Sequence, residues 1–143
     1  MADKYYELLE HTADIRIKVK GRSLKELFRN TALAMFDIIA EKLTADSSQL
    51  TAGKKIDIRQ KADNLEELFV NWLNDLLSLS ATEEKIFCEF EFRNLNERKL
   101  EVRVGGCDMK DYKVNTEIKA ATYHELKIEK APFGWQAEVI FDV

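Results

Sequence analysis

The stretch from Asp63 to Leu79 constrains the fold more than any other part of the sequence. Its large apolar residues recur at helical spacing, and they are Leu65, Leu68, Phe69, Trp72, Leu73, Leu76 and Leu77. Asp63 and Glu66 stand at the start with the spacing of a capping box, a motif that begins helices. A stripe of this kind is typical of a helix packed on a hydrophobic core. The sequence therefore predicts a helix over residues 63–79.

A second helix is predicted over residues 21–43, which read "GRSLKELFRNTALAMFDIIAEKL". Ser23 and Glu26 have the capping-box spacing. The apolar surface of this segment is broad, and its members are Leu24, Leu27, Phe28, Thr31, Ala34, Met35, Ile38 and Ile39. A helix this apolar needs cover on more than one side.

The remainder of the chain predicts strands. Ile15, Ile17 and Val19 alternate with charged residues, as in a strand with one buried face. Further strands are expected over residues 55–62, 85–94, 98–106, 113–130 and 135–143, after a loop over 44–55. The order, roughly β-β-α-β-α-β-β-β-β, predicts an α+β fold in which two helices pack between or against antiparallel sheets. No linker is evident, so residues 1–143 are predicted to form a single domain.

Composition and charge limit the function. With 143 residues and a formal net charge of -4, the chain offers no overall electrostatic footprint for nucleic acid, and no stable nucleic-acid binding is expected. Cys88 and Cys107 lack metal-binding spacing, which favours reduced thiols in the cytoplasm. The N-terminus lacks the apolar region of a signal peptide, and no apolar run approaches the roughly 18–20 residues that cross a bilayer. We expect a cytoplasmic protein with no membrane partner.

Three polar features have no evident role in folding. Asp14 enters the first strand, and Asp142 precedes the carboxylate of Val143 at the end of the last one. Such oxygen donors suit Mg²⁺, Ca²⁺ or Mn²⁺, but spacing alone favours a solvated terminus. The third feature is Lys119, which either points to water or acts as a cation near phosphate or the carboxylates.

Other kinds of site find little support in the sequence. His11 and His124 are its only histidines, and no serine or cysteine stands at motif spacing to be activated by them. The five glycines are scattered and form no phosphate-binding loop. A nucleophilic hydrolase, a nucleotide triphosphatase and a dinucleotide enzyme are therefore disfavoured.

Three separated motifs carry a resemblance to a known family. "EHTADI" near the start, "EIKAATYH" late in the chain and the final "FDV" occur in the order found in archease proteins. The two predicted helices also resemble the helices of that family. The similarity extends over essentially all 143 residues. It implies a fold in which helices lie between layers of sheet.

The resemblance also implies a function. Archease is a protein cofactor of the RtcB-type RNA ligase, which joins tRNA halves after intron removal. It promotes guanylylation of the ligase and multiple turnover, and it is not itself an enzyme. The resemblance thus implies an RNA-ligase partner and a divalent-metal cofactor. From the residues alone, a metal-dependent hydrolase of a small phosphorylated substrate is an alternative, and a general chaperone or adaptor is a third.

The family's functional residues map onto the polar features noted above. Its metal site corresponds to Asp14, Asp142 and Val143, and its required lysine corresponds to Lys119. His11 shapes the turn before the first strand or lines the site. We expect Asp14, Asp142 and Lys119 to be essential for activation of the ligase.

One segment departs from the family pattern. Family members often carry a Gly-Glu pair where this chain has Gly105 and Gly106, followed by Cys107 and Asp108. Many members also have a histidine where this chain has Tyr112. Asp108 is the candidate to replace the missing glutamate and to line the site.

Overall fold

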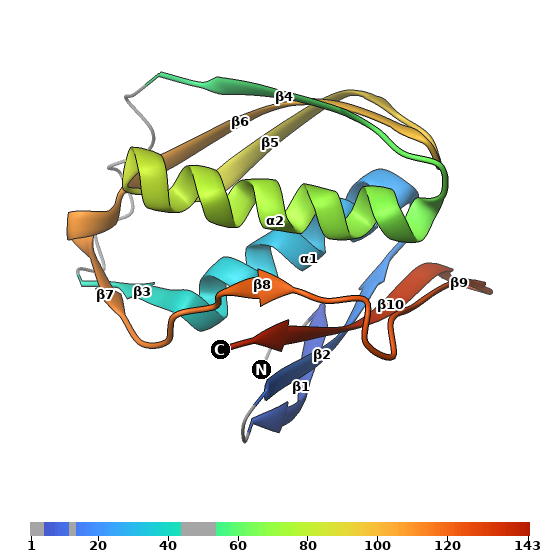
Figure 1. Cartoon of the computed structure of the whole chain (residues 1–143), viewed down its shortest axis with the longest axis horizontal. Helices are drawn as coiled ribbons and strands as arrows, with labels where there is room; N and C mark the ends of the chain where they lie inside the picture. Colours follow the sequence, from blue (N-terminus) through green and yellow to red (C-terminus); the bar gives the residue numbers. More distant parts are fainter. Residues whose placement is uncertain (1–4, 12–13, 44–53) are drawn as a thin grey trace.

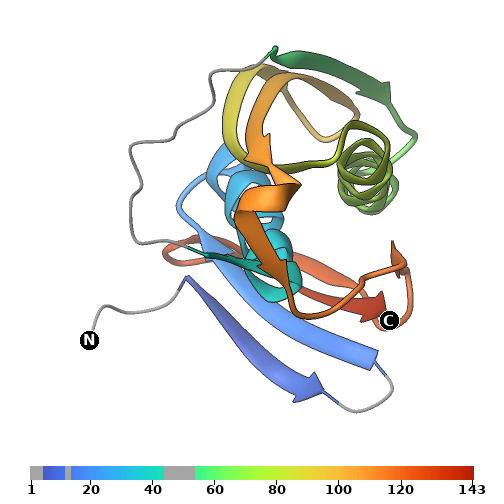
Figure 2. The same ribbon diagram turned by 90° about the vertical axis from the view of Figure 1, so that its left-hand side faces the viewer.

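The computed structural model describes residues 5–11, 14–43 and 54–143. Within these ranges, two α-helices lie between two antiparallel sheets (Figures 1 and 2). The helices are α1 (Leu24–Ile39) and α2 (Leu65–Glu83), and a 3₁₀ turn, η1, covers Met109–Asp111. The strands are β1 (Tyr6–His11), β2 (Asp14–Gly21), β3 (Ala40–Lys42), β4 (Ile56–Lys61), β5 (Lys85–Leu95), β6 (Lys99–Asp108), β7 (Tyr112–Val114), β8 (Ala120–Ala121), β9 (Lys127–Ala131) and β10 (Gly134–Asp142).

The strands of the described residues form two main sheets and a short ribbon. One sheet has the order β1-β2-β10-β8, with β9 also paired to β10, and the other has the order β4-β6-β5. The ribbon β3-β7 closes one end of the molecule (Figure 1). Every pairing is antiparallel. The predicted α+β fold, with helices between antiparallel sheets, is therefore confirmed.

The two helices join the sheets through one hydrophobic core. The predicted stripe of α2 is buried, and Leu68, Phe69, Trp72, Leu73 and Leu76 are 0% exposed. Trp72 donates its indole N–H to the carbonyl oxygen of Phe28 in α1 at 3.1 Å, and its ring lies 5.7 Å from that of Phe90 in β5. Neither helix in the described part of the chain is both long and apolar enough to cross a membrane.

The N-terminal cap of α1 is the predicted residue, whereas that of α2 is one residue after the predicted one. Ser23 caps α1 as predicted, because its hydroxyl accepts from the Glu26 N–H at 3.1 Å. At α2 the cap is Asn64, whose side chain accepts from the Glu67 N–H at 2.8 Å. The predicted cap at Asp63 was wrong by one residue. Both residue types are good caps, so residue type alone does not distinguish the two positions.

Two predicted elements are divided in the structure. The helix expected to reach residue 43 ends at Ile39, and β3 follows because it pairs with β7. The strand expected over 113–130 is broken into β7, β8 and β9. This segment serves two sheets, since β7 pairs with β3 whereas β8 and β9 pair with β10. A single straight strand cannot reach both partners.

The alternation predicted for β5 is also interrupted. The pairing of β5 with β6 shifts between Phe87 and Glu89, which leaves Cys88 as the extra residue of a β-bulge. As a result Phe87 is buried, at 1% exposure, although the alternation predicted it on the face opposite Ile86. At Gly106 a Cβ would lie 2.4 Å from the carbonyl oxygen of Ile86, so the close approach of the two strands requires glycine here.

Candidate functional site

Residues far apart in the sequence meet where β2 begins and β10 ends (Figure 1). Asp14 is directly opposite Asp142 in the β2–β10 pairing. On the other side of β10, Asp142 is opposite Ala120 of β8, and the N–H of Lys119 donates to the carbonyl oxygen of Asp142 at 2.8 Å. We call Asp14, Asp142, Val143 and Lys119 the carboxylate pole. The fold thus brings together all four residues predicted to act there.

The two aspartates of the pole share one face of the sheet. Residues directly opposite each other in an antiparallel pair project to the same side. Their neighbours Ile15 and Phe141 are 0% exposed and belong to the core. Because side chains alternate along a strand, Asp14 and Asp142 project from the outer face, and both are exposed. Like charges directly opposite destabilise a sheet, so this pair has no evident structural purpose.

Lys119 is held in place by the backbone on both sides of it. Ile118 and Ala121 are buried, at 6% and 4% exposure, whereas Lys119 itself is exposed. The side-chain amide of Asn74 in α2 donates to the Ala121 carbonyl at 3.1 Å and accepts from the Ala121 N–H at 2.8 Å. Asn74 therefore replaces a neighbouring strand along the edge of β8. Asn74 was not among the predicted site residues, although a polar residue directly after Leu73 of the apolar stripe was a signal for it.

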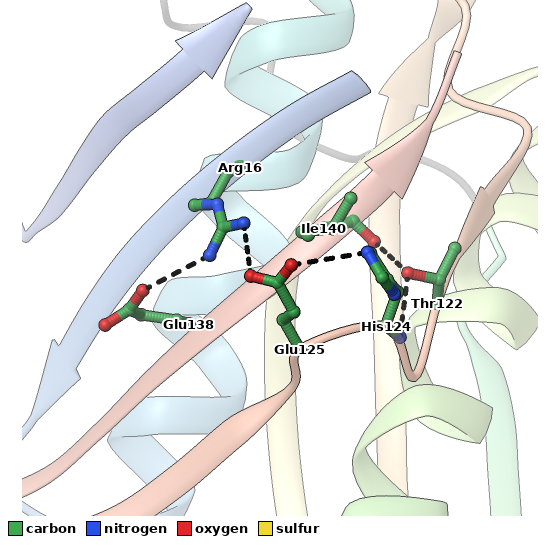
Figure 3. A network of polar contacts seen from close by, with 6 residues as sticks. All are labelled: Arg16, Thr122, His124, Glu125, Glu138 and Ile140. Atoms are coloured by element: carbon green, nitrogen blue, oxygen red, sulfur yellow. Dashed lines mark hydrogen bonds and ion pairs between the residues drawn. The ribbon is translucent and has the colours of Figure 1, made fainter. Parts of the chain in front are cut away.

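The segment that follows β8 is fastened across the outer face of the same sheet. The N–H and the hydroxyl of Thr122 both donate to the carbonyl oxygen of Ile140, at 3.0 and 2.9 Å. Arg16, two residues after Asp14, donates to the Glu125 carboxylate at 2.6 Å and lies 3.8 Å from Glu138 (Figure 3). The Arg16 guanidinium lowers the pKa of Glu125 below its ordinary value.

Two further residues, His11 and Asp108, were predicted to line the site, and the structure does not place either side chain at the pole. The backbone of His11 pairs with Ile15 in β1, but its side chain falls outside the described residues. Asp108 belongs to the other sheet, at the end of β6. Its carboxylate accepts from the Lys85 amine at 2.6 Å, and this bond lowers the pKa of Asp108. Asp108 is thus engaged in a surface ion pair and is not part of the pole.

The donor set of the pole is chemically suited to a hard divalent cation. Two carboxylates project from one face, and Val143 adds its oxygens one residue after Asp142. Carboxylate and main-chain oxygens are what Ca²⁺, Mg²⁺ and Mn²⁺ prefer. The described part of the chain holds no group of three or more His, Cys, Asp or Glu side chains that could bind a metal. Among the described residues, the donors that a cation at the pole could use are these two side chains and the oxygens of Val143.

Comparison with known proteins supports one family. The model of the Archease protein family (MTH1598/TM1083) matches residues 6–143. A protein archease from Methanosarcina barkeri is 38% identical, over 98% of this chain and 97% of its own length. Another from Pyrococcus abyssi is 34% identical, over 98% and 99%.

Solved structures agree with this assignment. The solution structure of Methanobacterium thermoautotrophicum protein 1598 has a TM-score of 0.71 at 27% identity and covers 99% of this chain and 100% of that chain. The crystal structure of an archease from Thermotoga maritima, described as a possible chaperone, has a TM-score of 0.63 at 25% identity, with 96% of each chain covered. The fold therefore defines a small α+β protein with helices enclosed by antiparallel sheets. The chain belongs to the archease family.

Proposed function

We propose that this protein is an accessory factor of an RtcB-type RNA ligase in tRNA splicing or RNA repair, where it promotes guanylylation and multiple turnover. The observation that carries the proposal is the pairing of Asp14 with Asp142 across β2 and β10, with Lys119 bonded to the same residue. Membership of the archease family supports it. The protein itself is proposed to be non-catalytic.

The residues of the pole would have distinct roles. Asp14, Asp142 and Val143 would hold a divalent cation, which supplies the positive charge needed beside a phosphate-rich active site. Lys119 is a compact point charge on a flexible stem. It would contact a phosphate or a carboxylate of the ligase, while its backbone bond to Asp142 keeps it beside the cation.

The decisive experiment is RNA ligation with the ligase held well below its substrate, in the presence of GTP and divalent metal. We expect this protein to sustain product formation beyond one turnover per ligase. Lys119→Ala and Asp142→Ala should remove that effect with folding intact, because both change the pole itself. Asp57→Ala is the matched control, since Asp57 is an exposed aspartate on the other sheet. A trace that stalls equally with and without the protein would refute the proposal.

The same preparations distinguish the alternative function. If the pole activated water for hydrolysis of a small phosphorylated substrate, the protein alone would release phosphate above background. Asp142→Asn would then abolish that release. We expect no such release, because the proposed role of the pole requires the ligase.

A further inference from the structure

The connection between β8 and β9, residues Thr122–Leu126, is a loop held by several hydrogen bonds, and we call it the strap. Thr122 makes its two bonds to Ile140, His124 donates its N–H to the Thr122 hydroxyl at 3.3 Å, and Leu126 donates its N–H to the Tyr123 carbonyl at 3.1 Å. Glu125 adopts a left-handed conformation with φ of 51°. A non-glycine residue held in this region is uncommon and requires surrounding contacts to maintain it.

The strap lies on the outer face of the five-stranded sheet, the face from which Asp14 and Asp142 project. β10 lies between β2 and the β8–β9 edge. The ion pair between Arg16 of β2 and Glu125 of the strap must therefore pass over β10, as Figure 3 shows. The burial of Ile140 in β10 also indicates that the strap covers this part of the outer face. Ile140 alternates with the core residues Val139 and Phe141 and so projects outward, yet it is 6% exposed and is not part of the main core.

The strap follows the pole along the same strands. Asp14, Asp142 and Ala120 form one row across β2, β10 and β8, and Arg16, Ile140 and Thr122 form the next. A surface that contacts the pole over more than a few ångströms must also meet the strap, because consecutive residues on one face of a strand are about 7 Å apart.

The strap presents two large side chains to solvent beside the pole. Tyr123 is 55% exposed, and the His124 side chain is 69% exposed, with its Nε2 3.3 Å from the Glu125 carboxylate. Neither side chain is part of the hydrophobic core. Tyrosine is enriched where partner proteins dock, because it buries a large area at low entropic cost and keeps a polar end. Because the hydrogen bonds of the strap already hold the backbone of the loop, binding through Tyr123 should cost little further ordering of the chain.

We propose that the strap is a protein-docking surface, with Tyr123 as its anchor and His124 at its rim, for the same partner that receives the carboxylate pole. The inference rests on the proposed function, because the partner is the ligase named there. The partner surface would offer an apolar pocket for the Tyr123 ring and a hydrogen-bonding group for its hydroxyl. The pole would then act on the active site, and the strap would supply affinity and orientation.

The test measures binding of the purified ligase to the full-length protein in the presence of divalent metal, together with stimulation of ligation. Tyr123→Ala should raise the dissociation constant about tenfold or more, as expected for an interface anchor. Tyr123→Phe should retain most of the affinity, since it keeps the ring. Phe133→Ala is the matched control, because Phe133 is an aromatic residue 46% exposed at the β9–β10 turn, and it should change binding less than twofold. Thermal unfolding of each variant should match wild type.

The outcomes separate the two proposals. If wild type binds and stimulates the ligase but Tyr123→Ala behaves like wild type, the strap proposal is overturned and the proposed function stands. If Tyr123→Ala leaves ligase binding unchanged and instead raises the KM for GTP, the strap contacts the nucleotide and the docking role is again refuted. If wild type neither binds nor stimulates, the proposed function fails, and the strap proposal fails with it.

Discussion

The two sheets differ in the charges that they pair across neighbouring strands: one pairs opposite charges and the other pairs like charges. Across β4 and β6, Asp57 is opposite Arg103, and the Arg103 Nε donates to its carboxylate at 2.9 Å. Across β2 and β10, Asp14 is opposite Asp142, a pair of like charges. The three aspartates are exposed and Arg103 is half-buried, and each pair is directly opposite in two antiparallel strands. Stability explains the first arrangement and opposes the second, so we propose that the second serves binding.

The largest difference between substitutions in the two sheets should be in how much an added divalent cation raises the free energy of unfolding. At a hundredfold excess over its dissociation constant, a cation bound only by the folded protein raises the free energy of unfolding by about 2.7 kcal/mol. We expect Asp14→Asn to abolish this gain, because it removes one of the two proposed aspartate ligands, and Asp57→Asn to leave it intact. Urea denaturation with and without Ca²⁺, Mg²⁺ or Mn²⁺ measures it. An equal gain in wild type and Asp14→Asn would place the cation elsewhere.

The support of the pole from α2 can be broken separately. Asn74→Ala removes the partners of both backbone groups of Ala121, which is 4% exposed. Leaving a buried polar group without a partner costs about 1–3 kcal/mol, so the free energy of unfolding should fall by that amount. Stimulation of the ligase should fall as well, since Lys119 directly precedes β8 and its position at the pole depends on that strand.

Asn71→Ala is the control for this change, because Asn71 is exposed on the same helix. It should leave both stability and stimulation close to wild type. Equal losses in the two variants would mean that the helix as a whole is sensitive, and that the Asn74 amide has no special role.

The repulsion between Asp14 and Asp142 should also affect stability when no cation is present. In metal-free buffer, Asp14→Asn should stabilise the protein by roughly 0.2–1 kcal/mol, the usual size of a cross-strand pair effect. Chemical denaturation in the presence of a chelator measures this gain. A loss of stability on the same substitution would show that the carboxylates are not in repulsion.

The smallest effect concerns acid stability on the other sheet. The Arg103 guanidinium holds the pKa of Asp57 below its ordinary value. The folded protein therefore binds this proton less readily than the unfolded chain, and the stabilisation is present above the ordinary pKa and lost as pH falls through the folded value. Asp57→Asn should thus destabilise slightly at pH 7 and have no effect in strong acid. A loss that is the same at both pH values would exclude the ion pair as its cause.

The periodic parts of the chain were predictable from the sequence. The apolar stripe that includes Trp72 and Leu76 specified a buried helix, and the alternation of Ile15, Ile17 and Val19 specified a half-buried strand. Such patterns are local, because the 3.6-residue and two-residue periods decide by themselves which side chains share a face. The family motifs also pointed to Asp14, Lys119 and Asp142 before any geometry was known.

What the sequence left undecided depends on contacts between distant segments. The break of residues 113–130 into three strands arises because β7 and β8 pair with strands of different sheets. The role of Asn74 exists only because α2 lies along the edge of β8. The pole itself needs the register that sets Asp14 against Asp142. Register is a property of two strands together, so no single stretch of residues encodes it, and only the packed fold decides which distant charges meet.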